Sequence, residues 1–300
     1  IPPIEGLDNL PHLTSKDVVN LEEMPSSIAI IGGGYIAAEL GHFFSAMGSD
    51  VTIIGRNDRF IPGEEPEISF IVAKKFGNRT NLMLGCEAIR VEQLKDQTIR
   101  VTTRSTDKKI TKTIRVNSVL IATGRGPLND LLKPEKAGIE LDSQGWIKVK
   151  KNLRTTRNHI WAFGDCIGNY PFKHAANYEA EIVKQNALFQ RNLEPNYNAI
   201  PHAVFTDPEV SSVGLGEERV IEKYGVEDII VGFSRFDETV KGQAIEAKPG
   251  FAKILANKDG KILGAHIVGP NSSMLIQEIV IAMENSVGLD AVGSSSHVHP

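Results

Sequence analysis

A glycine-rich segment near the start of the chain has the spacing of a dinucleotide-binding turn. It reads Gly32-Gly33-Gly34-Tyr35-Ile36-Ala37 and fits the pattern G-x-G-x-x-A. Gly32 permits a tight turn, Gly34 lets a pyrophosphate approach the backbone, and Ala37 allows the following helix to pack closely. The N-terminus of that helix would stabilise the phosphate charge. The segment predicts nucleotide binding where a strand precedes it and a helix follows, and a plain glycine-rich turn is the alternative.

The kind of nucleotide depends on the residues at the end of the second strand. An acidic residue there would bind a free ribose 2′-hydroxyl group, whereas arginines would accept a 2′-phosphate. The sequence has Gly55, Arg56 and Arg59 at this place. The two arginines favour NADP(H) over NAD(H), with ordinary solvated loop arginines as the alternative.

Two later segments end a buried strand in a turn of small residues, which lets a ligand approach the backbone. The first is Ile121-Ala122-Thr123-Gly124-Arg125, and the second is Trp161-Ala162-Phe163-Gly164-Asp165. The Asp165 carboxylate could accept hydrogen bonds from the hydroxyl groups of a polyol. Either segment alone could be a structural turn.

The elements that must position these residues have the order of an α/β protein. Strands rich in β-branched residues alternate with helices that carry apolar faces, which indicates βαβ units and a parallel sheet. The predicted elements of this first part are strands at 27–32, 51–54 and 119–122, helices at 35–47 and 66–76, and an inserted antiparallel hairpin within 88–116. We therefore expect a Rossmann-type dinucleotide-binding fold.

The rest of the chain predicts a second α/β piece and then an α+β domain. After Gly124 we expect strands at 146–149 and 160–163 and a helix at 175–188. From about residue 195 the pattern becomes rich in strands, at 203–206, 229–236, 252–255 and 262–268, followed by an amphipathic helix at 272–284.

Composition narrows the class of partner. The formal net charge is −4 and the basic residues are scattered, so nucleic acid is not an expected partner. No apolar run reaches the roughly 18 residues of a membrane-spanning helix, and the first residues lack the basic region and apolar core of a signal peptide. Cys86 and Cys166 lie far apart, which argues against a disulfide framework or a cysteine-based zinc site. We expect a soluble, cytoplasmic protein that handles small molecules.

Taken together, these motifs resemble those of the class I pyridine nucleotide-disulfide oxidoreductases, the family of the dihydrolipoamide, glutathione and mycothione reductases. The resemblance covers essentially the whole chain and continues in residues 173–180, 201–210, 213–214, 264–269 and 299–300. It implies FAD together with NADP or NAD as cofactors, and a homodimer. It also implies four parts: a linker from an absent FAD-binding segment (1–20), an NAD(P)-binding domain (21–123), a returning part of the FAD-binding domain (124–195) and a truncated dimerisation domain (196–300).

The resemblance assigns expected roles to individual residues near the cofactors. Asp165 would hold the ribityl chain of FAD, and the helix that begins near His174 and Ala175 would point its positive end at the flavin. Glu39 corresponds to the glutamate beside the nicotinamide, and Tyr35 to the aromatic gate over the flavin. The remaining expected cofactor contacts are Gly32, Gly34, Ile36, Ala37, Arg56, Arg59 and Gly124. A surface glutamate, a packed tyrosine and an ordinary helix-start histidine are the alternatives.

His299 is the expected catalytic residue. In the family the histidine before a proline reaches across the dimer and serves as acid and base for the thiol that attacks the substrate disulfide. The glutamate that orients it would follow after Pro300. A zinc site at His297 and His299 is the alternative, but two histidines without further ligands do not predict one, so no metal is expected.

The sequence departs from the family in lacking a C-x-x-x-x-C redox pair. Cys86 and Cys166 do not match it, and we expect both to be structural. The resemblance favours a dihydrolipoamide dehydrogenase-like enzyme acting on a small disulfide or dithiol or on a lipoyl domain, although this chain alone should not turn over. The terminal His-Pro argues against mercuric reductase. Mycothione or another low-molecular-weight disulfide reductase, an FAD-dependent oxidase and a non-catalytic nucleotide-binding module are the alternatives.

Overall fold

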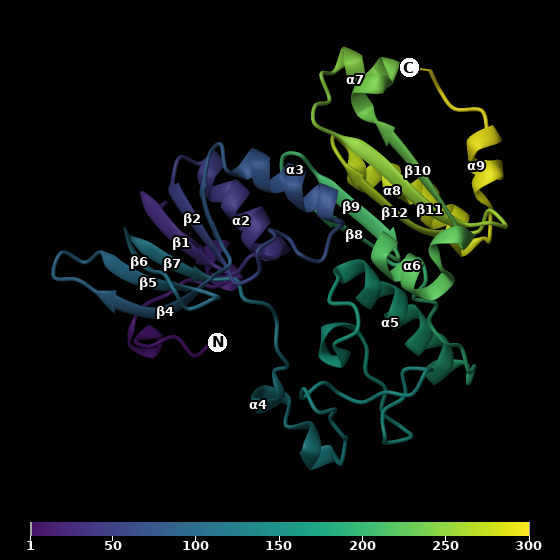
Figure 1. The fold of residues 1–300 in the computed structure, drawn as a ribbon. Helices are drawn as coiled ribbons and strands as arrows, with labels where there is room; N and C mark the ends of the chain where they lie inside the picture. The colour runs from purple at the N-terminus through teal and green to yellow at the C-terminus, as the bar shows by residue number, and fades with distance from the viewer. Residues whose placement is uncertain (1, 300) are drawn as a thin grey trace. The chain divides into compact units, whose positions relative to one another are not determined.

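The computed structural model describes residues 2–299 and separates into two compact units (Figure 1). The first unit contains the chain up to Gly124 and again from Pro201 onward, and the second is Arg125–Ile200. Among the described residues, no helix is both long enough and apolar enough to cross a membrane.

The first unit begins with a parallel sheet in the order β3-β2-β1-β7. Its side chains alternate between two faces because neighbouring residues of a strand point in opposite directions. Ile28 and Ile30 pack against helices α2 and α3, whereas Ala29 and Ile31 face the other side. The elements are β1 (Ser27–Ile31), α2 (Tyr35–Ala46), β2 (Asp50–Gly55), α3 (Pro66–Phe76), β3 (Asn81–Leu84) and β7 (Ser118–Ile121). The predicted βαβ unit is confirmed.

An antiparallel sheet covers the second face of the parallel sheet. It contains β4 (Cys86–Gln93), β5 (Ile99–Ser105) and β6 (Thr111–Val116), so the predicted hairpin has a third strand. The first N-terminal residues pack here as well: Ile4, Leu7 and Leu10 are buried in the same apolar cluster. In the short helix α1 (Ser15–Val18), Val18 packs instead against the cluster on the side of α2 and α3.

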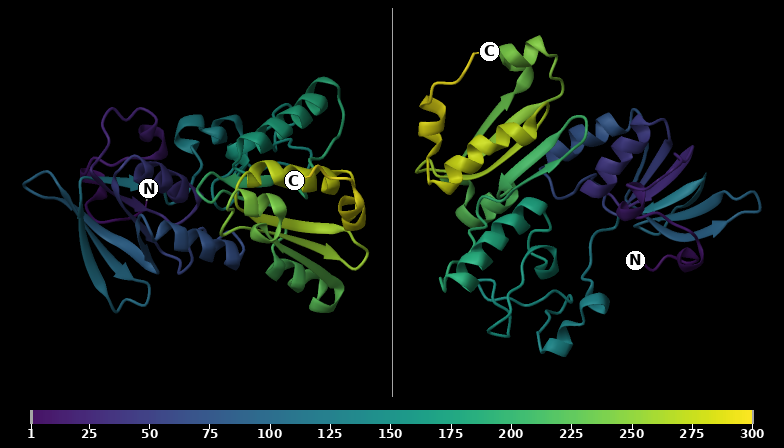
Figure 2. Two further views of the ribbon diagram at one scale, coloured as in Figure 1. Left: turned by 90° about the horizontal axis from the view of Figure 1, so that it is seen from above. Right: turned by 180° about the vertical axis from the view of Figure 1, so that it is seen from behind.

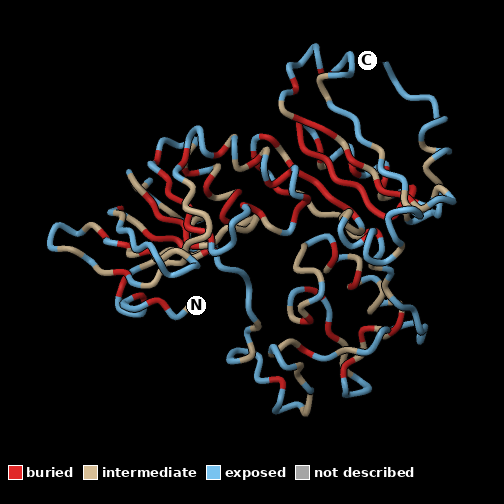
Figure 3. The backbone as a smooth tube through the Cα atoms, in the orientation of Figure 1, coloured by how far each residue is buried: buried red, intermediate tan, exposed pale blue. Residues whose placement is uncertain are grey.

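The C-terminal part of the first unit is an antiparallel sheet in the order β10-β11-β12-β9-β8. The helix α8 (Ser272–Glu284) packs against β8, β9 and β12, and the central strands are the most deeply buried (Figures 2 and 3). The strands are β8 (Pro201–Val204), β9 (Val210–Gly214), β10 (Ile229–Arg235), β11 (Phe251–Asn257) and β12 (Ile262–Val268), with α6 (Glu217–Tyr224), α7 (Val240–Ala244) and α9 (Leu289–Ser294) as further helices. The predicted helix at 272–284 and strand at 262–268 are confirmed.

The second unit has less regular structure than the sequence predicts. The helix α5 (Lys173–Leu188) is present and begins two residues before the predicted start, and α4 (Asn129–Leu132) is a single turn. The strands predicted at 146–149 and 160–163 are wrong: Ile147, Val149 and Trp161 each form only an isolated bridge. A strand needs a partner of similar length, and the described partners of these residues meet them at one point each.

Candidate nucleotide-binding site

A cavity of about 690 Å³ opens at the carboxyl ends of β1, β2 and β7. This is where open α/β sheets bind their ligands, and the volume is in the range of ligand pockets, roughly 300–1,000 Å³. The glycine turn forms one wall, the segments that follow β2 and β7 form others, and the antiparallel sheet closes one end. The residues that line it include Gly32, Gly34, Tyr35, Ile36, Arg56, Asn57, Cys86, Glu87, Arg104 and Gly124.

The glycines of the turn have different physical roles. Gly32 has φ +135°, and a Cβ atom there would lie 2.2 Å from the carbonyl oxygen of Ala122. Only glycine fits that position, because both the dihedral angle and the contact exclude a side chain. A Cβ atom on Gly34 would meet no described atom within 4 Å, so its side-chain space opens into the cavity. Gly34 therefore leaves room for a ligand rather than for protein.

The N-terminus of α2 points its backbone donors at this space. Gly34 is the N-cap residue, and no described side chain caps the helix. The first backbone N–H groups of a helix have no partner within the helix and favour an anion. Tyr35 and Ile36 line the cavity from the first turn, while Ala37 is fully buried in the core.

The structure brings some of the predicted cofactor residues into this cavity and places others elsewhere. Arg56 lines it, but Arg59 is exposed in the same loop and is not among the described lining residues. Glu39 is not among the described lining residues, and its carboxylate accepts a hydrogen bond from the Phe205 backbone N–H (3.0 Å). That bond ties α2 to the segment after β8.

Sequence reasoning missed the end of the cavity formed by the antiparallel sheet. Cys86 and Glu87 on β4 and Arg104 on β5 line it. Arg104 donates a hydrogen bond to Glu87 across the two strands (2.9 Å). Pairing of opposite charges across an antiparallel ladder was the available signal, but it required the register of the two strands.

The second unit holds the residues predicted to contact a flavin. Asp165 is exposed in a short 3₁₀ helix and forms an ion pair with Arg125. Glu179 of α5 is fully buried; it accepts hydrogen bonds from the Gly164 backbone N–H (2.5 Å) and the Tyr197 hydroxyl group (2.6 Å). This carboxylate fixes the turn that carries Asp165.

The first turn of α5 contains an exposed His174 and a fully buried Ala175, and the described side chains provide no cap for it. Cys166 donates to the Phe163 carbonyl oxygen (3.2 Å), and burial raises the pKa of its thiol. A raised pKa keeps the group as the less reactive thiol.

The C-terminal histidines lie after α9. His299 is exposed, and Pro300 lies outside the described residues. His297 forms a hydrogen bond with Glu278 of α8 (2.8 Å), which raises the pKa of that imidazole. Within residues 2–299, no group of three or more histidine, cysteine or acidic side chains is placed to hold a metal ion.

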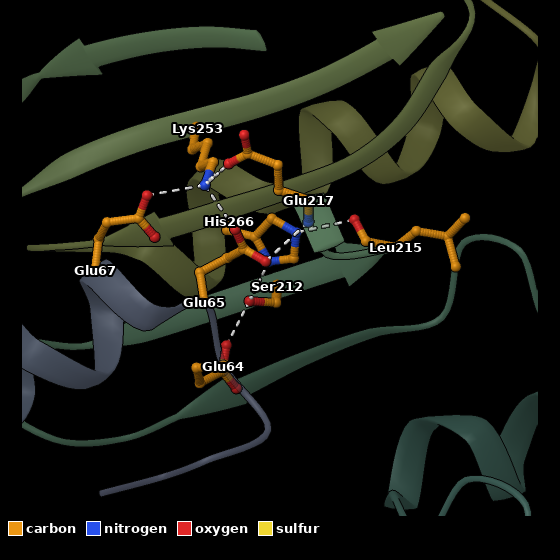
Figure 4. A network of polar contacts seen from close by, with 8 residues as sticks. All are labelled: Glu64, Glu65, Glu67, Ser212, Leu215, Glu217, Lys253 and His266. Atoms are coloured by element: carbon orange, nitrogen blue, oxygen red, sulfur yellow. Dashed lines mark hydrogen bonds and ion pairs between the residues drawn. The ribbon is translucent and has the colours of Figure 1, made fainter. Parts of the chain in front are cut away.

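A buried polar network anchors the loop between β2 and α3 to the C-terminal sheet (Figure 4). The Ile61 backbone N–H in this loop also donates to the Gly33 carbonyl oxygen (2.7 Å), so the network supports the glycine turn. Glu64 contacts His202 on β8 and Ser212 on β9, both at 2.6 Å. His266 on β12 extends the chain of contacts to Ser212 at 3.0 Å.

Lys253 forms the second half of the network. It is 1% exposed on β11, and its ammonium group contacts Glu65 (2.6 Å), Glu67 (3.0 Å) and Glu217. Burial lowers the pKa of Lys253, but the three carboxylates outweigh burial and raise it. The lysine is therefore a permanent cation among anions.

The Glu64 and His202 pair predicts a pH-dependent contribution to stability. Burial lowers the pKa of His202, but the hydrogen bond and charge of Glu64 outweigh it and raise the pKa above 6.5. Burial raises the pKa of Glu64, but its partners outweigh burial and lower the pKa below 4.5. The stabilisation by His202 is complete below pH 6.5 and is lost as the pH rises through the pKa of His202 in the folded protein. The stabilisation by Glu64 is complete above pH 4.5 and is lost as the pH falls through the pKa of Glu64 in the folded protein.

We therefore expect His202→Gln to lower the free energy of unfolding by roughly 1 kcal/mol near pH 6 and by less as the pH rises through the folded pKa of His202. Urea unfolding of both proteins at several pH values measures the difference. Subtraction also removes the titration of His266, because that residue is present in both. A difference in the free energy of unfolding that stays constant with pH would contradict a charged pair of Glu64 and His202.

An open parallel sheet, a glycine turn and a cavity at the carboxyl ends of the strands define an α/β dinucleotide-binding protein. The chain belongs to the pyridine nucleotide-disulphide oxidoreductase family: it matches the model of that family over residues 1–191 and the model of the family's dimerisation domain over residues 200–300. The predicted family and fold class are confirmed.

Several known proteins are similar to the chain. The dihydrolipoyl dehydrogenase of Haloferax volcanii is 34% identical over 304 residues, covering 99% of this chain and 62% of that protein. The mercuric reductase of Bacillus cereus is 34% identical over 94% of this chain and 44% of its own length. The Cu(II) complex of the HOCl-induced flavoprotein disulfide reductase RclA from Escherichia coli has a TM-score of 0.89 at 28% identity, covering 100% of this chain and 68% of that one. The chain thus spans less than two thirds of the length of the dihydrolipoyl dehydrogenase and of the mercuric reductase.

Proposed function

We propose that this chain is the nucleotide-binding and interface part of an FAD-dependent NAD(P)H:disulfide oxidoreductase of the dihydrolipoamide dehydrogenase type. The observation that carries the proposal is the cavity at the glycine turn, with its uncapped helix N-terminus and its arginines. Membership in the pyridine nucleotide-disulphide oxidoreductase family supports the reaction class. The redox cysteine pair would lie outside these residues, because the chain has only Cys86 and Cys166.

The residues present fit a flavin. Asp165 presents an exposed carboxylate, and the uncapped start of α5 would favour negative charge. Asp165, His174 and Ala175 would therefore hold FAD. When bound, FAD supplies an acceptor for the hydride of a nicotinamide and a route for two electrons to a disulfide.

The chain's own residues would bind and orient the nucleotide and move a proton. The glycine turn would hold the pyrophosphate, Tyr35, which lines the cavity, would cover the flavin, and Glu39 would lie beside the nicotinamide. In a homodimer, His299 of one chain would serve the disulfide site of the other, giving and taking the proton of the attacking thiol. The dimerisation domain supports this assembly.

We further propose dihydrolipoamide or a lipoyl domain as the substrate, because dihydrolipoyl dehydrogenases are prominent among the relatives. Both described cysteines are free thiols, which supports a reducing, cytoplasmic location. The direction of electron flow would follow the redox poise of the cell.

The test is thiol-disulfide activity of the intact protein with dihydrolipoamide, mycothiol disulfide and glutathione disulfide, with NAD(H) and NADP(H) in parallel. We expect His299→Ala to lower kcat by about 10²–10⁴-fold, because a general acid-base group contributes that much. His297→Ala is the matched control and should retain most of the activity, since that histidine pairs with Glu278. No turnover with any disulfide despite bound FAD would contradict the proposed disulfide reductase and favour an FAD-dependent oxidase.

A further inference from the structure

The nucleotide cavity is lined by charged residues of two different sheets. Arg56 follows β2 of the parallel sheet, and Glu87 and Arg104 come from β4 and β5 of the antiparallel sheet. Glu87 and Arg104 stand directly opposite each other in the strand register. Two guanidinium groups and one carboxylate thus give this part of the cavity a net positive charge.

Arg104 has hydrogen-bond donors to spare. One terminal nitrogen donates to Glu87 at 2.9 Å, and the guanidinium group carries five N–H donors in all. Its Nε atom is buried and finds no hydrogen-bond partner among residues 2–299. The side chain as a whole is 38% exposed, so the terminal nitrogen that does not bond to Glu87 is the donor that a ligand in the cavity could reach.

The end of β2 carries no acidic residue that would select a free ribose, because Gly55 occupies that place. A Cβ atom there would lie 3.0 Å from Leu84 Cδ2 and 3.5 Å from Gly33 Cα. A carboxylate that would repel a 2′-phosphate is therefore absent from this described position.

We propose that Arg104 and Arg56 together bind the 2′-phosphate of NADP(H), so that a specificity-determining residue lies on the inserted antiparallel sheet. The inference rests on the proposed function only in requiring that the cavity binds a nicotinamide nucleotide. A guanidinium group and a phosphate form strong charge-assisted hydrogen bonds, and the terminal nitrogen of Arg104 that does not bond to Glu87 supplies one of them. Arg59 is not among the described residues that line the cavity and has no part in the proposed site.

The experiment uses two probes that lack the nicotinamide, adenosine 2′,5′-bisphosphate and 5′-AMP, titrated into the intact protein by calorimetry. Their affinity ratio isolates the 2′-phosphate and requires neither flavin reduction nor a disulfide. We expect the bisphosphate to bind at least about 10-fold more tightly than 5′-AMP. Arg104→Gln should reduce that ratio by about 10-fold while the affinity for 5′-AMP stays within about twofold.

Two matched variants and one conservative variant test the assignment. Arg100→Gln changes another arginine of β5, paired with Glu92 and outside the described cavity lining, and Arg59→Gln changes the loop arginine. Both should leave the ratio unchanged. Arg104→Lys keeps the charge but loses the planar guanidinium fork, so it should give a ratio between those of the parent and Arg104→Gln. Arg104→Lys keeps the proposal testable if Arg104→Gln fails to fold.

Different failures separate the inference from the proposed function. Binding of both probes with equal affinity, or an equal loss of both in Arg104→Gln, would overturn the role of Arg104 and leave the nucleotide cavity in place. A loss of the ratio in Arg59→Gln instead would also overturn it. Binding of neither probe to the folded parent protein would overturn the nucleotide site itself and the inference with it.

Discussion

Replacing Lys253 by methionine should lower the free energy of unfolding by about 3–5 kcal/mol. The lysine lies 1% exposed among Glu65, Glu67 and Glu217, and its removal leaves these carboxylates close together without a cation. Methionine fills similar space, so the loss reports the missing charge rather than a cavity. Urea unfolding at pH 7 of the parent and the variant measures the effect.

The matched control is Lys258→Met, because Lys258 forms a salt bridge with Asp228 in which both side chains are more than 60% exposed. Exposed pairs contribute about 0–1 kcal/mol, so this change should have little effect. Combining Lys253→Met with Glu65→Gln should restore part of the lost stability, since it removes the most deeply buried of the three unpaired charges. A loss at Lys253 no greater than that at Lys258 would show that the buried network does not hold the loop to the sheet.

Gly32→Ala and Gly34→Ala should differ in their effects on stability although they change the same turn: the first should lose both stability and nucleotide binding, the second mainly nucleotide binding. Alanine at Gly32 adopts an unfavourable φ and meets the Ala122 carbonyl oxygen, so we expect a loss of at least about 2 kcal/mol of stability and of nucleotide binding. Alanine at Gly34 meets no described atom and should cost less than about 1 kcal/mol. It should still lower the affinity for NADPH at least about 10-fold, because its methyl group fills the space of the pyrophosphate.

Thermal or urea unfolding and titration with NADPH measure the two quantities separately. A loss of NADPH affinity without a loss of stability in Gly34→Ala would indicate that the added methyl group occupies space that the nucleotide needs. Unchanged affinity for NADPH in a folded Gly34→Ala protein would mean that the phosphates do not lie at this turn.

Local pattern was sufficient where an element depends on its own residues. The glycine turn, the strands on either side of α2 and the apolar face of α8 follow from residue type and spacing within one short segment. Prediction failed where a strand depends on a distant partner. Residues 146–149 and 160–163 have the composition of strands but meet single bridging residues, so no ladder forms among the described residues.

The site divides in the same way. Gly32, Gly34, Tyr35 and Arg56 were found from one motif and the strand after it, and all four line the cavity. Arg104 could not be found in this way, because it reaches the cavity only through the register of β5 against β4. Arg59 seemed equivalent to Arg56 in the sequence, and both are exposed in the loop after β2, but only Arg56 is among the described residues that line the cavity.

By itself, then, the sequence determined the βαβ order around the glycine turn and the turn itself, because these depend on dihedral preferences and hydrophobic periodicity over a few residues, and the resemblance of its motifs indicated the family. Only the tertiary structure decided which charges meet. Lys253 and Glu65 lie 188 residues apart, and their 2.6 Å contact exists because α3 begins beside the C-terminal sheet. Buried ion pairs and cavity walls form between elements that are distant in the chain, and no local preference encodes such a distance.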